Sequence, residues 1–258
     1  MRKKTARTGD DAGEMSLSGH LRELRNRLLV WLGALAAAMV AGLCYAPRLL
    51  GFLLRLGEKY RYRFVYLSPE ELLLEYMAVA LAAALCLTFP LLLYELWAFL
   101  RPGLKPGERT LALAAICSGT AFAILGVLFA GKLLVPFMLR FLISLCEGGT
   151  VQPSISVRNY VSFLLTVFLV FACVFELPVA AVLLTQFHLL TVETLKRFRK
   201  AALPLVFLLA AVITPPDVVS QLLVAVPLLL LYEISIVFST WAEKIRGRFQ
   251  NTRGRDGL

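Results

Sequence analysis

The sequence predicts an all-α membrane protein that crosses the bilayer with six helices. Of its 258 residues, 59% are hydrophobic, and the mean hydropathy of +0.76 is far above that of a soluble domain. About 20 residues of helix cross a hydrocarbon core roughly 30 Å thick. The apolar residues gather in six segments, at 28–46, 72–100, 111–137, 161–184, 201–213 and 218–238.

The placement of positive charge predicts the orientation of the chain. In a six-span arrangement, 19 of the 27 Lys and Arg residues fall on one side of the membrane. By the positive-inside rule that side is the cytoplasm, so both termini are expected there. The net charge of +10 thus sets topology and attracts anionic lipid; it does not indicate nucleic-acid binding. We divide the chain into a disordered tail (1–15), a membrane domain (16–241) and a basic cytoplasmic tail (242–258).

The first two helices have recognisable features. Leucines along one face before the first span predict an amphipathic helix at the cytoplasmic surface, running into that span. Gly33, Ala37 and Ala41 recur every four residues and would let another helix approach closely. Residues 47–71 are expected to form an outside loop, and the second helix should begin at Pro69, with acidic residues in its first turn.

The fourth span carries the most informative position. Glu176 is the only charged residue in 161–184, and a carboxylate there costs about 2.5–3.5 kcal/mol on insertion scales. It should therefore face a bundle interior, a wet cavity or a partner. Because Pro178 cannot donate to the carbonyl of Val174, the helix should also bend nearby. Glu176 is either an interhelical hydrogen-bonding residue or a functional polar contact.

The last two spans are short, the sixth because Gln221 and Glu233 leave only 222–232 free of strongly polar residues. Segment 201–213 has 13 residues, about 20 Å of helix, so it should thin the bilayer or be shielded by partners. Pro215, Pro216 and Asp217 join it to the next span in a tight outside hairpin. Asp217 could simply cap the next helix. Gln221, one turn on, indicates a polar patch at the outer mouth.

Catalytic chemistry has no support in the sequence. Residues 126–132 have the glycine–lysine spacing of a phosphate loop, but Leu133 stands where Ser or Thr is required, and no strand precedes it. The two histidines, His20 and His188, belong to no hydrolytic motif. The five scattered cysteines are expected to fill the core. We therefore expect no enzymatic activity, no cofactor and no metal.

Three acidic residues near the cytoplasmic ends of helices are candidates for binding a cationic partner: Glu108, Glu23 and Glu95. The simpler interpretation is an ion pair within the chain, for instance between Glu23 and Arg27 one turn on. The alternative is a receptor site for an arginine-bearing partner, since a planar guanidinium pairs well with carboxylate.

Separated motifs occur in one order that resembles TatC, the receptor subunit of the twin-arginine protein translocase. The resemblance covers about 16–241. The motifs are HLRELRNR at 20–27, YELWAF at 94–99 with the following PGL and ER, FELPV at 175–179, and TPPD at 214–217 with SQ at 220–221.

The resemblance implies a six-helix, glove-shaped protein in a bacterial or archaeal cell membrane. It would assemble as a homo-oligomer with TatA- or TatB-type single-span subunits and depend on the proton-motive force. Its cytoplasmic tip would bind the twin-arginine signal peptide of a folded passenger. Glu108 would pair with the signal's arginines, with Glu23, Glu95, Arg25 and Phe99 in the same surface.

The same resemblance places Glu176, beside Pro178, in a concave membrane pocket, where it would meet a polar residue of a single-span partner. Two positions depart from the family pattern: Ala172 stands where glycine is common, and Glu95 where glutamine is common. The alternative function is a proton- or ion-coupled secondary transporter that uses Glu176. It would favour an inverted repeat, and no related halves are found in the sequence.

Overall fold

The computed structural model of the protein describes residues 17–60, 62–100, 106–144, 154–187, 189–214 and 217–255, without the side chains of 17–18, 100, 106–112, 115 and 245–255. The expected disordered tail, 1–15, lies outside these residues. The helices are α1 Leu17–Glu58, α2 Pro69–Leu100, α3 Pro106–Phe129, a π-helical turn Ala130–Leu134, α4 Val135–Ser144, α5 Val157–Phe175, α6 Leu177–Gln186, α7 Val192–Ile213 and α8 Val218–Arg255.

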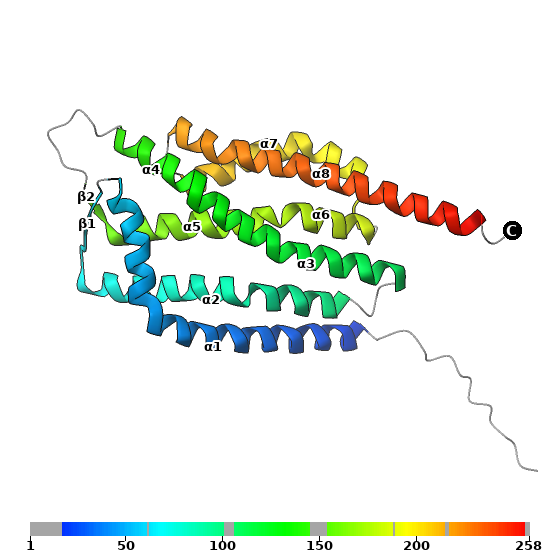
Figure 1. Ribbon diagram of the computed structural model, residues 1–258, viewed down its shortest axis with the longest axis horizontal. Helices are drawn as coiled ribbons and strands as arrows, with labels where there is room; N and C mark the ends of the chain where they lie inside the picture. Colours follow the sequence, from blue (N-terminus) through cyan, green and yellow to red (C-terminus); the bar gives the residue numbers. More distant parts are fainter. Residues whose placement is uncertain are drawn as a thin grey trace, which may run out of the picture.

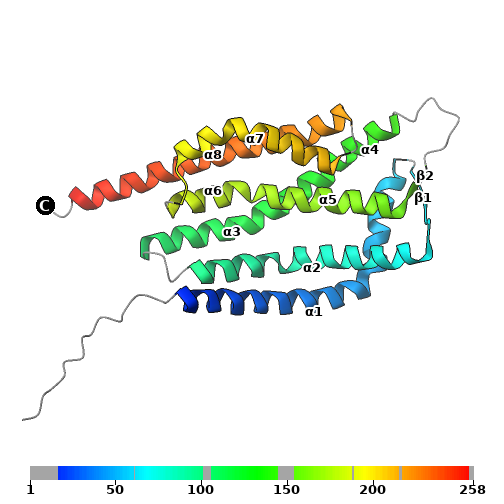
Figure 2. The same cartoon turned by 180° about the vertical axis from the view of Figure 1, so that it is seen from behind.

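The helices run between two ends of the molecule (Figure 1). We call the end where α1 and α3 begin and α2 finishes the N-terminal end. The opposite end carries two short strands, β1 (Arg63–Val65) and β2 (Ser154–Ser156), and we call it the strand end. Seen from behind, α5 and α6 lie between the pair α1 and α2 and the pair α7 and α8 (Figure 2).

The predicted spans correspond to these helices. Among the described residues, five helical stretches are long and apolar enough to cross a membrane, and they contain or overlap the segments expected at 28–46, 72–100, 111–137, 161–184 and 218–238. The remaining segment, 201–213, is the apolar part of α7, whose first turns are polar. The basic region after 241 continues α8 as helix through Arg255.

The expected outside loop 47–71 is wrong in its first half, because α1 continues as helix to Glu58. Pro47 cannot donate to the carbonyl of Leu43, so α1 bends there and turns across the strand end (Figure 1). Leu50 and Leu53 are buried on the inner face of the turned segment. Apolar burial beyond the proline thus keeps these residues helical.

At the strand end, backbone pairing and hydrogen bonds join two segments that are far apart in the sequence. Strands β1 and β2 pair in parallel, a small sheet that the all-α expectation did not include. Beside it, the Glu71 carboxylate accepts hydrogen bonds from the N–H of Leu67 at 2.7 Å and of Arg158 at 2.7 Å, and from the Ser156 hydroxyl. Ser156 is the N-cap of α5 but makes no side-chain cap itself. Glu71 therefore caps α5 from a different helix.

The core lies around α5, where Leu164, Val167 and Phe171 are fully buried, and α5 packs mainly against α3 and α2. The predicted small-residue face of α1 is not part of it. Gly33 has no atom within 4 Å where a Cβ would stand. The close approach of α1 to α2 is made instead at Gly42, where a Cβ would lie 3.0 Å from the carbonyl oxygen of Ala80.

The cysteine prediction is also wrong. Among the described residues the four free cysteines are all exposed on the helix surfaces, at Cys44, Cys86, Cys117 and Cys173, while Cys146 lies outside those residues. A thiol tolerates an apolar lipid-facing surface as readily as a core, so composition alone did not separate the two.

Candidate functional site

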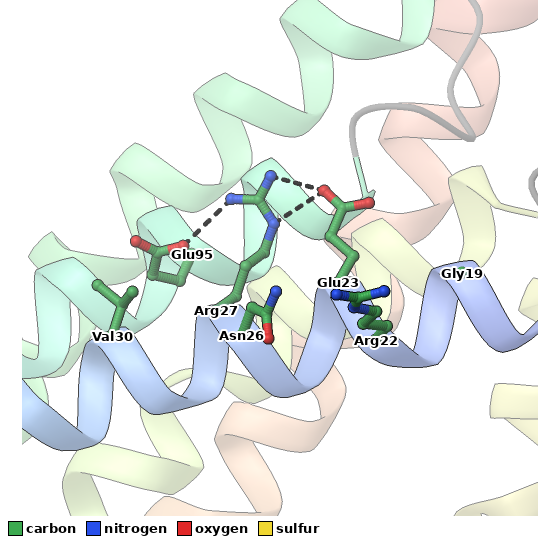
Figure 3. A pocket seen from close by; sticks show the side chains of 7 residues that line it. All are labelled: Gly19, Arg22, Glu23, Asn26, Arg27, Val30 and Glu95. Atoms are coloured by element: carbon green, nitrogen blue, oxygen red, sulfur yellow. Dashed lines mark hydrogen bonds and ion pairs between the residues drawn. The ribbon is translucent and has the colours of Figure 1, made fainter.

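An open groove of about 740 Å³ lies at the N-terminal end, between α1 and the end of α2 (Figure 3). It brings together two of the predicted acids, Glu23 from α1 and Glu95 from α2. Glu23 lies in the second turn of α1, and Glu95 lies in the second-last turn of α2. The other residues that line the groove are Gly19, Arg22, Asn26, Arg27 and Val30.

The Arg27 guanidinium lies between these two carboxylates (Figure 3). Its Nε and Nη2 donate to Glu23 Oε1 at 3.0 and 2.7 Å, and its Nη1 donates to Glu95 Oε2 at 3.1 Å. The simpler interpretation of Glu23, an ion pair one turn along the helix, is therefore confirmed, and Glu95 joins the same pair. Glu23 Oε2 remains buried without a hydrogen-bond partner.

The other residues predicted at this end are placed differently. The Phe99 ring stacks on His20, with ring centroids 4.2 Å apart, which ties the end of α2 to the start of α1. Arg25 is exposed and does not line the groove, because it lies about 200° around α1 from Glu23. Glu108 lies in the first turn of α3 at the same end, but its side chain is outside the described residues.

The second candidate site is the break between α5 and α6. Glu176 separates the two helices, and its N–H donates to the carbonyl of Cys173 at 3.2 Å, the tighter spacing of a turn. Pro178 is buried at the second position of α6, where its missing N–H is tolerated. The predicted bend beside the carboxylate is thus confirmed as a break in the helix.

The Glu176 carboxyl group points at α3. A Cβ on Gly119 would lie 2.8 Å from Glu176 Oε2, so the glycine makes the room that the carboxyl group occupies. Leu93 of α2 also reaches this point, with its Cδ1 3.0 Å from the same Cβ position. Glu176 Oε1 is buried and has no hydrogen-bond partner among the described residues. An acid group with an open acceptor therefore sits where three helices meet.

The predicted outer hairpin is only partly described. Pro215 and Pro216 lie outside the described residues. Asp217 Oδ1 accepts from the N–H of Ser220 at 2.7 Å, so Asp217 caps α8, as its simpler interpretation required. The Gln221 side-chain amide donates to the carbonyl of Phe207 at 3.0 Å and fastens α8 to α7.

Sequence reasoning missed two acids of α2. The sequence places Glu71 among the acidic residues of the first helical turn, and its motifs assign no role to Glu75, one turn on. In the structure both are at most 4% exposed, and Glu75 Oε2 has no hydrogen-bond partner. The sequence does contain a signal for them. Two acids four residues apart lie on the same face of a helix, and in a membrane span such a face is expected to be buried or to meet a partner. Among the described residues no cluster of three or more His, Cys, Asp or Glu could hold a metal ion.

Comparison with known proteins gives one consistent result. The family model of the Sec-independent protein translocase protein (TatC) matches residues 19–227. TatC of Listeria innocua serovar 6a is 36% identical over 225 residues, which cover 87% of this chain and 91% of that protein. TatCy of Bacillus subtilis strain 168 is 34% identical over 226 residues, covering 88% and 89%.

The fold agrees as well. A crystal structure of the twin arginine translocase receptor TatC superposes with a TM-score of 0.78 at 33% sequence identity, and the match covers 87% of this chain and 99% of that one. The predicted six-helix membrane fold is thereby confirmed. Because a family model covers most of the chain and relatives above 30% identity span nearly their whole length, the chain belongs to the TatC family of Sec-independent protein translocase subunits, multi-pass membrane proteins that are not enzymes.

Proposed function

We propose that this chain is the receptor subunit of a twin-arginine translocase and that its N-terminal end binds the paired arginines of a signal peptide. The observation that carries the proposal is the arrangement in Figure 3, where two carboxylates from different helices hold one guanidinium. The two carboxylates are placed so that both can accept hydrogen bonds from one guanidinium, which is the geometry needed to recognise an arginine side chain from another polypeptide.

The intramolecular Arg27 has a role in this proposal. It keeps Glu23 and Glu95 in place and compensates their charge while no signal peptide is bound. An incoming arginine would exchange with Arg27, and it would reach the buried, unpartnered Oε2 of Glu23 only in that exchange. Glu108 would add a third carboxylate from the start of α3. Phe99 would contribute an apolar wall, and exposed Arg25 would contact polar groups of the signal peptide outside the groove.

The preference of arginine for water also indicates which side of the membrane the N-terminal end faces. The N-terminal end and both termini would face the cytoplasm of a bacterial or archaeal cell, where arginine pairs stay hydrated at the membrane surface. The apolar part of the signal would then enter the membrane. The membrane domain would comprise residues 16–241, followed by a basic tail, 242–258, at the lipid surface. The assembled complex would contain several copies of this chain and be driven by the proton-motive force.

Glu176 is proposed as the intramembrane contact for a single-span TatA- or TatB-type subunit. Its support is the buried Oε1 without a partner, because such an atom gains most from a donor supplied by another chain. The break before Pro178 gives the approaching helix an irregular backbone to pack on. The Gln221 side-chain amide already donates a hydrogen bond to the carbonyl of Phe207 within the chain. Pro215, Pro216 and Asp217 would close the outer hairpin.

The test is a binding titration of the purified protein in nanodiscs with a fluorescent signal peptide carrying Arg-Arg, compared with a Lys-Lys peptide. We expect Glu108→Gln and Glu95→Gln each to weaken Arg-Arg binding about tenfold, the loss of one charge-assisted hydrogen bond. Glu58→Gln, an exposed acid at the strand end, is the matched control and should bind normally.

Two results would contradict the proposal. One is equal affinity for the Arg-Arg and Lys-Lys peptides. The other is unchanged affinity when Glu95 and Glu108 are neutralised together in a protein that keeps its thermal stability.

A further inference from the structure

The turned segment of α1, beyond Pro47, has two faces of opposite character. Leu50 and Leu53 on its inner face are buried in the core. Four exposed residues at helical spacing form its outer face, and we call them the cationic face: Arg48, Phe52, Arg55 and Lys59. Steps of four, three and four residues place them within about 60° of one another around the helix. Lys59 follows the last residue of α1, and its N–H still donates to the carbonyl of Arg55 at 3.3 Å, so it keeps the helical spacing.

The turned segment begins at the level of the lipid headgroups. Pro47 lies 19 residues, about 28 Å, after the apolar run begins at Leu28, and the hydrocarbon core is roughly 30 Å thick. At the bend, the Arg48 guanidinium lies over the ring of exposed Tyr45, 5.8 Å from its centroid. Exposed tyrosines are enriched at the boundary between membrane and water. From there the segment runs across the strand end (Figure 1), which keeps the cationic face close to the headgroup layer.

The described carboxylates leave this positive charge uncompensated. None of the three ion pairs among the described residues includes a residue of the cationic face. Glu58 is the only acid in 48–60, and it takes part in none of these ion pairs. A further exposed cation joins from α4, because Arg140 lies 5.6 Å from the ring centroid of Tyr60, the residue after Lys59. Positive charge from two helices therefore meets at one place.

Phe52 indicates which kind of partner the cationic face meets. Its side chain is 64% exposed, between Arg48 and Arg55. At the headgroup boundary this pattern is favourable on both counts, because an aromatic ring enters the acyl region while the neighbouring cations reach the phosphates. Charge complementarity then selects anionic headgroups. The positive-inside rule gives no reason for these cations, since most Lys and Arg residues lie at the other end.

We propose that the cationic face, together with Arg140, binds the phosphate groups of anionic phospholipids such as phosphatidylglycerol in the leaflet at the strand end, with Phe52 inserted between the acyl chains. A phosphate held by Lys59 and Arg140 would fasten the end of α1 to α4. The surface lies at the opposite end of the molecule from the groove at Glu23 and Glu95, and it does not rest on signal-peptide binding.

The test is photo-crosslinking of the full chain in phosphatidylcholine nanodiscs. These contain a small fraction of either phosphatidylglycerol or phosphatidylcholine with the same photoreactive group on the acyl chain, next to the headgroup. Mass spectrometry measures the labelling of residues 48–60. We expect phosphatidylglycerol to label this segment about tenfold more than phosphatidylcholine. Arg55→Gln combined with Lys59→Gln should abolish that preference, because each cation near an anionic surface contributes about fivefold to binding.

Three further variants separate lipid binding from a change in the fold. Lys196→Gln combined with Lys200→Gln removes two exposed cations with the same spacing near the start of α7, and should leave the labelling of 48–60 unchanged. Glu58→Gln should increase labelling by phosphatidylglycerol, since it removes the one acid of this segment, and misfolding would not produce such a gain. Phe52→Ala should lower labelling by both lipids and keep their ratio.

Equal labelling by the two lipids would overturn the proposal. A preference that survives the double substitution at Arg55 and Lys59 would also overturn it, because the headgroup would then be recognised elsewhere. Soluble competitors distinguish other anions, with the ionic strength held constant. Loss of labelling on addition of inorganic phosphate would show a site for free phosphate, and loss on addition of a polyglutamate peptide would show a site for an acidic polypeptide. Either result would overturn the choice of lipid.

Discussion

The carboxyl group of Glu176 rests against Gly119 of α3, at the place where a Cβ would lie 2.8 Å from Oε2. The glycine is therefore needed for the position of the acid as well as for helix packing. Because the obstructed atom is the end of a flexible side chain, an added methyl group should turn the carboxyl group away and leave the fold intact.

We expect Gly119→Ala to lower transport of a twin-arginine passenger in membrane vesicles severalfold while the melting temperature changes little. Gly33→Ala is the matched control, since nothing lies within 4 Å of its Cβ position. Full transport by Gly119→Ala would mean that the orientation of Glu176 does not matter.

Gly126 differs from Gly119 because backbone blocks it. A Cβ there would lie 2.5 Å from the carbonyl oxygen of Phe171 and 3.0 Å from the Phe175 ring. Gly126→Ala should push α3 away from α5 and destabilise the fold by about 1–3 kcal/mol, as overpacking does. The measurement is thermal unfolding in detergent. Gly131→Ala, whose Cβ would meet only the Phe168 ring at 3.2 Å, should cost clearly less; equal losses would refute this account.

Glu71 should be the most sensitive acid at the strand end. Glu71→Gln leaves one acceptor oxygen for three donors, those of Leu67, Ser156 and Arg158, and an unmet buried donor costs about 1–3 kcal/mol. Hydrogen exchange should accelerate in the first turn of α5, and the melting temperature should fall. Glu70→Gln, the exposed neighbour, should change neither. Unaltered exchange in Glu71→Gln would show that the cap is dispensable.

The bilayer should be thin beside α7. Its apolar part is 201–213, about 20 Å of helix, against a hydrocarbon core of roughly 30 Å. A nanodisc map should show the two headgroup layers closer together next to α7 than next to α2. Uniform thickness around the protein would count against the prediction and would indicate that partner helices shield α7.

Features set by neighbours in sequence were predictable. The start of α2 at Pro69, the break at Glu176, the Asp217 cap and the Glu23–Arg27 pair all depend on groups within four residues of one another. Their geometry follows from helix periodicity and from the missing N–H of proline. The number of spans followed similarly, because segment length and hydropathy are local properties.

Contacts between distant segments were decided by the tertiary structure. Arg27 meets Glu95 across 68 residues, and Glu71 meets Arg158 across 87. Periodicity shows that a helix has an apolar face but not which neighbour covers it, so the outward position of Gly33 and the pairing of Gly119 with Glu176 were not predictable. The sequence by itself determined a six-helix membrane protein with acids at particular depths. Only the packing of those helices decided which acids are satisfied within the chain and which keep an open oxygen, because a hydrogen bond depends on distances that local sequence does not define.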